Sequence, residues 1–250
     1  MGELTLTAWL WLAVAGVLVG VAKTAIAGVG SIAVVIFAAV LPARESTGAI
    51  LPLLLVGDVV AVAYYRRHAD WGTLWRLLPG VLPGLLLGVW FLAMVDDVVM
   101  RRTIAATLLV MCALQLWQRV RGPDLTTGTA GRPHGAATLG MGVAAGFATM
   151  TANAAGPVTT VYLIRAGLPM LQMIGTGAWF YLVVNLTKVP FSAGLGLITP
   201  VSLVRDALLV PALLLGAALG TVVVKRLKQR QFEVVALGFS AGTALLLLLG

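Results

Sequence analysis

Two stretches decide the fold of this chain: TAIAGVGSIAVVIFAAVLP at residues 24–42 and TANAAGPVTTVYLIRAGLP at residues 151–169. Each begins with small and polar residues and continues as a short apolar run that ends in Leu-Pro. As a helix, the ten residues from Ile32 to Leu41 would reach only about 15 Å, half the hydrocarbon core of a bilayer. The pattern predicts a break or half-length helix at corresponding places in the two halves.

Composition indicates that these stretches lie in a membrane. Hydrophobic residues make up 60% of the 250 and charged residues 10%, with a mean hydropathy of +1.02, whereas a soluble domain is about a quarter charged. Cys112 is the single cysteine, so an internal disulfide is excluded. Only Glu3 is charged before the first apolar run, which favours a first membrane helix over a signal peptide. We predict an all-α, polytopic integral membrane protein.

Ten apolar segments account for most of the chain, and the second and seventh are the short ones. They are 4–22, 25–41, 46–65, 74–95, 98–118, 136–150, 154–168, 170–190, 200–224 and 232–249. The short segments either cross with an irregular start or re-enter as hairpins. Both arrangements give each half an odd number of crossings, so the halves face opposite ways.

An internal repeat supports this division. The two Leu-Pro ends are 127 residues apart, and the same offset places Asp58 on Asn185. At an offset of 128, PGLLLG at 83–88 matches PALLLG at 211–216. We expect two inverted-topology repeats, residues 1–121 and 136–250, joined by a cytoplasmic linker at 122–135, with their broken or re-entrant helices meeting near the membrane midplane. Paired broken segments of this kind mark the binding site of a transporter.

Basic residues in the loops and toward the ends of the spans set the expected orientation. One side collects Arg66, Arg67, Arg76, Arg119, Arg121, Arg132, Arg165, Lys225, Arg226, Lys228 and Arg230. The other collects Arg44, Arg101, Arg102 and Arg205, interspersed with Glu45, Asp96, Asp97 and Asp206. The first side is predicted to be cytoplasmic, which leaves both termini outside. Because the bases flank apolar segments, the net charge of +8 does not indicate a nucleic-acid partner.

Four polar residues lie within or beside predicted spans, where an ionisable group is costly and is a functional candidate by default. Asp58 is well inside the third segment and is favoured as a proton-coupling or cation site, with Asn185 as its neutral counterpart. Lys23 precedes the first break, and either lines a buried site or extends to the interface. Lys188, one turn beyond Asn185, is equally open to both interpretations.

The breaks themselves suit an anion. Helices that begin near Ser31 and Pro157 would present free backbone N–H groups and positive dipole ends, and two such ends meeting at mid-depth would bind a negative group. Helix packing through small residues is the alternative explanation, but it accounts poorly for the paired half-length helices. The expected substrate-binding residues are Lys23, Gly28, Gly30, Ser31, Thr151, Asn153, Gly156, Pro157 and Asn185.

Other chemistry finds little support. The two histidines, His68 and His134, are isolated, so no metal site or cofactor is expected. No Walker-type phosphate loop occurs, and no Ser/His dyad or acid pair lies at membrane depth, so neither ATP-driven pumping nor an enzyme is expected.

The layout resembles the TauE/SafE sulfite exporter family, also called the toluene-sulfonate uptake permeases. The resemblance rests on GVGS at 28–31, NAAGP at 153–157, and GLPMLQMIGTGAWFYLVVNLTKVP at 167–190. It extends over nearly the whole chain, although neither break has the usual G-x-G-G string of the family. The resemblance implies a secondary carrier of the bacterial inner membrane for sulfite, sulfoacetate or another organosulfonate.

We therefore expect a secondary transporter for a small anion that works by alternating access, with proton coupling through Asp58. An anion channel and a carrier of a non-sulfur organic acid are the alternatives. The expected partners are the small anion and the lipid bilayer, with monomer and homodimer both open.

Overall fold

The computed structural model describes residues 4–24, 29–121 and 135–223, and those residues form helices joined by short connections without any strand. The first half contains α1 (Leu6–Thr24), α2 (Gly30–Val40), α3 (Ala43–Ala49), α4 (Leu51–Tyr65), the short 3-10 helix η2 (Arg66–His68), α5 (Trp71–Met94) and α6 (Asp97–Arg121). The second half contains α7 (Ala136–Ala152), α8 (Gly156–Arg165), α9 (Met170–Gly194) and α10 (Pro200–Val223). The tenth predicted segment, 232–249, lies outside the described residues.

Four stretches of the described chain are long and apolar enough to cross a membrane: Leu6–Thr24, Ala43–His68, Trp71–Met94 and Pro200–Val222. By contrast, α2 has 11 residues and α8 has 10, so each is about 15 Å long and half a bilayer deep. The prediction of short helices after the breaks is therefore confirmed. The predicted segment 46–65 differs in detail, because Pro52 has no N–H to continue a helix and the segment is divided at Ile50 into α3 and α4.

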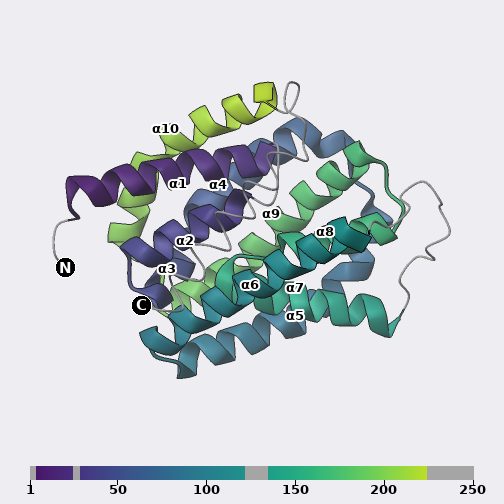
Figure 1. Ribbon diagram of the computed structural model, residues 1–250, viewed down its shortest axis with the longest axis horizontal. Coiled ribbons are helices and arrows are strands. Elements are labelled where there is room, and N and C mark those ends of the chain that lie inside the picture. Colours follow the sequence, from purple (N-terminus) through teal and green to yellow (C-terminus); the bar gives the residue numbers. More distant parts are fainter. Residues whose placement is uncertain (1–3, 25–28, 122–134, 224–250) are drawn as a thin grey trace.

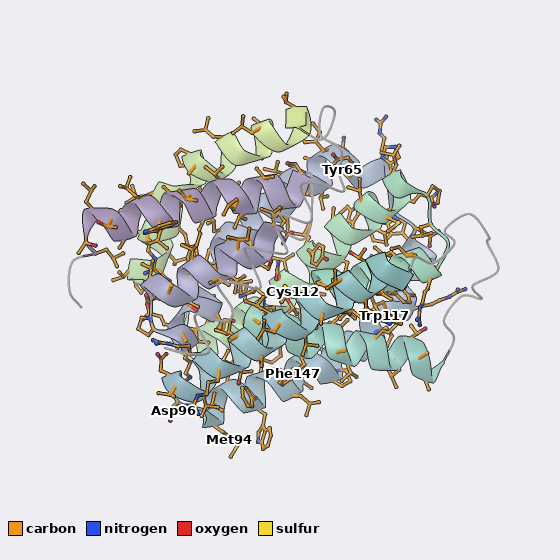
Figure 2. All side chains as sticks on the ribbon, viewed as in Figure 1. Tyr65, Met94, Asp96, Cys112, Trp117 and Phe147 are labelled. Carbon is orange, nitrogen blue, oxygen red and sulfur yellow. The ribbon has the colours of Figure 1, made fainter. Side chains whose placement is uncertain are left out.

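The helices pack in pairs that combine the two halves of the chain. In Figure 1, α1 lies beside α10 along one edge of the molecule, α5 lies beside α7 along the opposite edge, and α4 and α9 lie between them. Figure 2 shows Tyr65, at the end of α4, at one end of the bundle, and Met94 and Asp96, at the end of α5, at the other. The chain between these residues, which is mainly α5, thus runs from one end of the bundle to the other.

Glycines bring the outer pairs into backbone contact. A Cβ carbon placed on Gly20 of α1 would lie 2.0 Å from the carbonyl oxygen of Leu213, and one on Gly216 of α10 would lie 2.0 Å from that of Val17. In the other pair, a Cβ carbon placed on Gly84 of α5 would lie 2.2 Å from the carbonyl oxygen of Val143. Small residues are the usual means of close helix packing in membranes, where hydrophobicity does not drive helices together.

Candidate functional site

A buried ion pair links the end of α1 to the middle of α4. Lys23, in the last turn of α1, donates from Nζ to Asp58 Oδ1 at 2.5 Å. The Asp58 side chain is fully buried, and its other oxygen, Oδ2, accepts from Asn185 Nδ2 of α9 at 2.7 Å. A carboxylate removed from water is stable only when it is paired in this way.

Lys188 extends the contacts from α9 to α7. Its side chain is 1% exposed, and Nζ donates to the backbone oxygen of Thr149 at 2.8 Å and to Asn153 Oδ1 at 2.5 Å. Asn185 Oδ1 lies 3.5 Å from the same nitrogen. Every one of these acceptors is neutral. Lys23, Asp58, Asn185, Lys188 and Asn153 thus form one continuous set of contacts, called here the polar network.

Asn153 owes its position in the network to its backbone. It ends α7 in the left-handed region with φ 48°, the only non-glycine residue with positive φ in the described part of the chain. Asparagine tolerates this conformation better than most residues. The turn directs its amide to Lys188 on one side and to the backbone oxygen of Thr47, in α3, at 3.0 Å on the other. One side chain therefore fastens α7 to α3 and α9.

The surroundings of Lys23 accommodate its side chain and stabilise its charge. A Cβ on Gly57 would lie 2.9 Å from Lys23 Cγ, so the absence of a side chain at 57 lets the lysine stem pass beside α4. The ring of Tyr181, in α9, lies 4.8 Å from Lys23 Nζ, within the range of a cation–π contact. The Lys23 cation is therefore held by a carboxylate and an aromatic face.

The network has more basic than acidic groups. Lys23 and Lys188 contribute two amines and Asp58 one carboxyl group, and the Lys23–Asp58 contact is the single salt bridge within residues 4–24, 29–121 and 135–223. The hydrogen bonds of Lys188 all go to neutral oxygens. Buried charges are normally paired, so this site would gain from the arrival of a negative group.

The other predicted site residues lie at the breaks. Gly30 begins α2 and packs against Ala22, the neighbour of Lys23, where an added Cβ would lie 3.5 Å from that of Ala22. Ser31 follows in the first turn of α2. Gly156 and Pro157 begin α8, three and four residues after Asn153, and neither α2 nor α8 has a side-chain cap. Both helix starts therefore lie close in sequence to network residues.

The remaining predicted site residues are Thr151 and Gly28. Thr151 is fully buried, but its hydroxyl donates to Phe147 O within α7 at 2.9 Å, so it is bonded within its own helix in this conformation. Gly28 lies outside the described residues.

Sequence reasoning left some of the site undecided. From the sequence, Lys188 could either extend to the membrane interface or line a buried site. The structure buries it as a member of the network. Tyr181 was not singled out as a lysine contact, since a cation–π pair between α1 and α9 has no sequence signal. Arg205 and Asp206 were counted with the outer loops in the charge argument, although they lie inside the segment predicted at 200–224, and the structure buries both in α10.

Membrane-length helices around a buried ionisable network, with two half-length helices beginning beside it, are the construction of a membrane transporter. A sequence model described as Sulfite exporter TauE/SafE matches residues 12–247, nearly the whole chain, so the protein belongs to that family of membrane transporters. The resemblance inferred from the two breaks is thereby confirmed. No curated protein and no solved structure shows significant similarity to the chain.

Proposed function

We propose that this protein is a secondary transporter that carries a small sulfur-containing oxyanion, such as sulfite, sulfoacetate or another organosulfonate. The presence of two lysines but only one acid in the polar network is the observation that supports it most directly. An oxyanion brings the missing negative charge and several acceptor oxygens, which match the ammonium groups of Lys23 and Lys188.

The starts of α2 and α8 would complete the anion site. Each has uncapped backbone N–H groups and the positive end of a helix dipole, and each begins within a few residues of Lys23 or Asn153. In this arrangement Gly30, Ser31, Gly156 and Pro157 shape the cradle, and Asn153 and Asn185 orient the lysines. The hydroxyl of Thr151 would reach the anion only after leaving Phe147 O.

Asp58 would couple the anion to a proton. With Asp58 ionised, Lys23 Nζ is held by the carboxylate at 2.5 Å. A proton on Asp58 removes that attraction and releases Lys23 to bind an anion oxygen. When the anion leaves, Lys23 returns and the proton departs. The same exchange works for import and export.

The proposed repeats give the mechanism its symmetry. At the offset of 127, α1 corresponds to α7, α5 to α10 and α4 to α9, so the α1–α10 pair has the α7–α5 pair as its counterpart. Asp58 and Asn185 also correspond, and they contact each other. A residue can contact its own counterpart only near the axis that relates two repeats. We therefore place the inverted repeats at 1–121 and 136–250, with alternating access about the polar network.

Flux into proteoliposomes tests the proposal. Labelled sulfite, thiosulfate, sulfoacetate, taurine and plain carboxylates would be compared, first as substrates and then as unlabelled counter-substrates on the opposite side. A carrier of sulfur oxyanions gives saturable uptake of one or more of these, accelerated by the same anion in trans. Unsaturated flux without trans-acceleration would indicate an anion channel, and selection of carboxylates alone would indicate an organic-acid carrier.

A further inference from the structure

Tyr181 belongs to the same face of α9 as two members of the polar network. It precedes Asn185 by four residues and Lys188 by seven, a spacing that places side chains on one side of a helix. Asn185 contacts Asp58 through a hydrogen bond. Tyr181 contacts the network differently, because the centroid of its ring lies 4.8 Å from Lys23 Nζ. The ring has no role so far in the proton exchange proposed for Asp58.

The phenol group of Tyr181 faces α8. It lies next to the hydroxyl of Thr159, a buried residue in the first turn of that helix. Thr159 itself donates to Ala155 O at 3.0 Å, just before the helix begins. Tyr181 therefore connects the end of α1, which carries Lys23, with the start of α8, which follows the second break.

Neighbouring residues restrict the position of the ring. Phe180 meets it in a T-shaped arrangement, with ring centroids 5.4 Å apart and an interplanar angle of 78°. One turn earlier in α9, a Cβ carbon placed on Gly177 would lie 3.8 Å from Tyr181 Cε2, an ordinary van der Waals distance. A ring supported in this way can hold a cation in one place.

Lys23 needs a second partner whenever Asp58 takes up a proton. Its side chain is 13% exposed, so water compensates the ammonium charge only in part. An aromatic face attracts an ammonium group, and more strongly when the pair is removed from water. In the described part of the chain, Asp58 and Tyr181 are the two side chains that attract Lys23 Nζ at close range. Once the carboxyl group is neutral, the ring is the main attraction that remains.

The other titratable groups near the pair do not replace the ring. Lys188 of α9 can only repel Lys23. Asp206 of α10 approaches α4 at Leu53, five residues before Asp58 and about 7.5 Å away along the helix. Tyr65, at the end of α4, donates to the backbone oxygen of Thr24 at 3.1 Å and does not contact Lys23 Nζ.

We propose that Tyr181 is a positioning residue that holds the ammonium group of Lys23 while Asp58 is protonated. Its role in transport rests on the proposed proton coupling of Asp58. With the carboxyl group neutral, Lys23 Nζ stays over the ring and faces the incoming anion instead of extending to the membrane interface. The contact between Tyr181 and Thr159 makes the start of α8 sensitive to where Lys23 lies.

A double-mutant cycle without any transported anion tests the contact, with thermal unfolding of the full-length protein in a maltoside detergent as the readout. Asp58→Asn imitates the protonated acid, and Tyr181→Met removes the ring while filling most of its space. Tyr181→Met should lower the unfolding midpoint by about 2–4 °C more in the Asp58→Asn background than in the unmodified protein. A purely structural role of the ring would give equal losses.

Two further variants separate the ring face from other effects. Tyr181→Phe keeps the face and should lose the same amount in both backgrounds. Phe180→Met is the matched control, because Phe180 is a fully buried aromatic residue of the same helix outside the polar network. Its effect on the midpoint should also be independent of Asp58→Asn.

Flux of the anion that the unmodified protein carries gives an independent measurement. Tyr181→Met should raise the half-saturating concentration about fivefold and leave the maximal rate near normal, whereas Tyr181→Phe should stay close to the unmodified protein. Absence of saturable flux in the unmodified protein would contradict the proposed function, and the unfolding cycle would still decide the role of Tyr181. Equal losses from Tyr181→Met in both backgrounds, the same additional loss in Tyr181→Phe, or an unchanged half-saturating concentration would overturn the proposal.

Discussion

At the scale of single residues, the Lys23–Asp58 pair is the most informative contact. Removing one partner of a buried pair usually costs more than the pair itself contributes, because the remaining charge stays buried. Lys23 is 13% exposed whereas Asp58 is fully buried, so the lysine is the partner that can move. This asymmetry is why we assign the proton to Asp58 and the motion to Lys23.

Asp58→Asn should uncouple transport from protons. An amide cannot take up a proton, so Lys23 is no longer released by one, and the variant should carry the anion without responding to an imposed pH gradient. Flux into proteoliposomes with and without the gradient measures this. Asp96→Asn is the control, because Asp96 is exposed and caps α6 through Val99 N, a task that asparagine performs equally well. A gradient-driven flux in Asp58→Asn equal to that of the unmodified protein would remove the proton role.

Lys188→Met should remove anion binding and leave the fold in place. Methionine fills most of the lysine volume, and no carboxylate loses a partner, because Lys188 contacts only neutral acceptors. We expect the stabilisation by sulfite in thermal unfolding to fall at least tenfold in apparent affinity. Leu186→Met, at an exposed position of α9, is the matched control and should bind normally. Unchanged sulfite affinity in Lys188→Met would exclude this lysine from the site.

The sequence could predict part of this site and not the rest. Asp58 and Asn185 are identified by the repeat offset and by their depth in apolar segments, so the sequence alone indicates their importance. The Lys188–Asn153 contact depends on a left-handed turn at the end of α7, and nothing in the string NAAGP specifies which way that amide points. Likewise, the sequence places Asp206 in the apolar segment at 200–224 but does not show that its side chain is buried.

At the scale of elements, the turn at Asn153 fixes how α7 gives way to α8. Asn153→Gly should keep the backbone and lose only the side-chain contacts with Lys188 and Thr47. Asn153→Ala loses the same contacts and also pays roughly 1–2 kcal/mol for a left-handed backbone with a Cβ. Both variants should lose anion affinity, and only the alanine variant should show the additional loss of unfolding free energy, measured by denaturation in detergent. Equal stability of the two would show that the turn is not a constraint.

The glycine contacts make α5 and α7 a tightly packed pair. Gly84→Ala should destabilise the protein by about 1–3 kcal/mol or more, because the new Cβ would lie 2.2 Å from Val143 O, a backbone atom. Gly140→Ala, in α7 with open space around it, should be neutral or add up to about 1 kcal/mol through helix propensity. Midpoints of thermal unfolding compare the two. A harmless Gly84→Ala would mean that the pair is less closely packed than described.

Helix positions were predictable because an apolar run of membrane length must satisfy its backbone hydrogen bonds internally, and a helix does so. The half-length helices were also predictable, since small polar openings and Leu-Pro ends delimit them in the sequence. The division between α3 and α4 was not anticipated, although Pro52 follows it directly in the first turn of α4, because prolines within membrane helices are often tolerated, as in α5 and α9.

At the scale of the whole molecule, orientation is the open prediction. Basic residues gather on the side that includes η2 and the linker at 122–135, so we expect that side to be cytoplasmic and both termini to lie outside, in the inner or plasma membrane. A reporter that is active only in the cytoplasm should be silent when fused to the C-terminus and active when inserted in the linker. The reverse pattern would invert the assignment.

The pairing of helices also determines what can move. The closely packed pairs α1–α10 and α5–α7 each take one helix from either half of the chain, so we expect each rigid body to combine the two proposed repeats. Access is then expected to alternate by motion of these mixed pairs against α4 and α9, which hold Asp58, Asn185 and Lys188 between them.

This interleaving has an evolutionary consequence. On the proposed repeat, an ancestor with a single copy could have built neither mixed pair alone, and would have worked only as two identical chains inserted in opposite directions. Fusion in tandem would have fixed one copy in each direction and freed the copies to diverge. Such divergence allows the carboxylate of Asp58 to face the amide of Asn185. Two identical chains would have placed either two acids or two amides against each other.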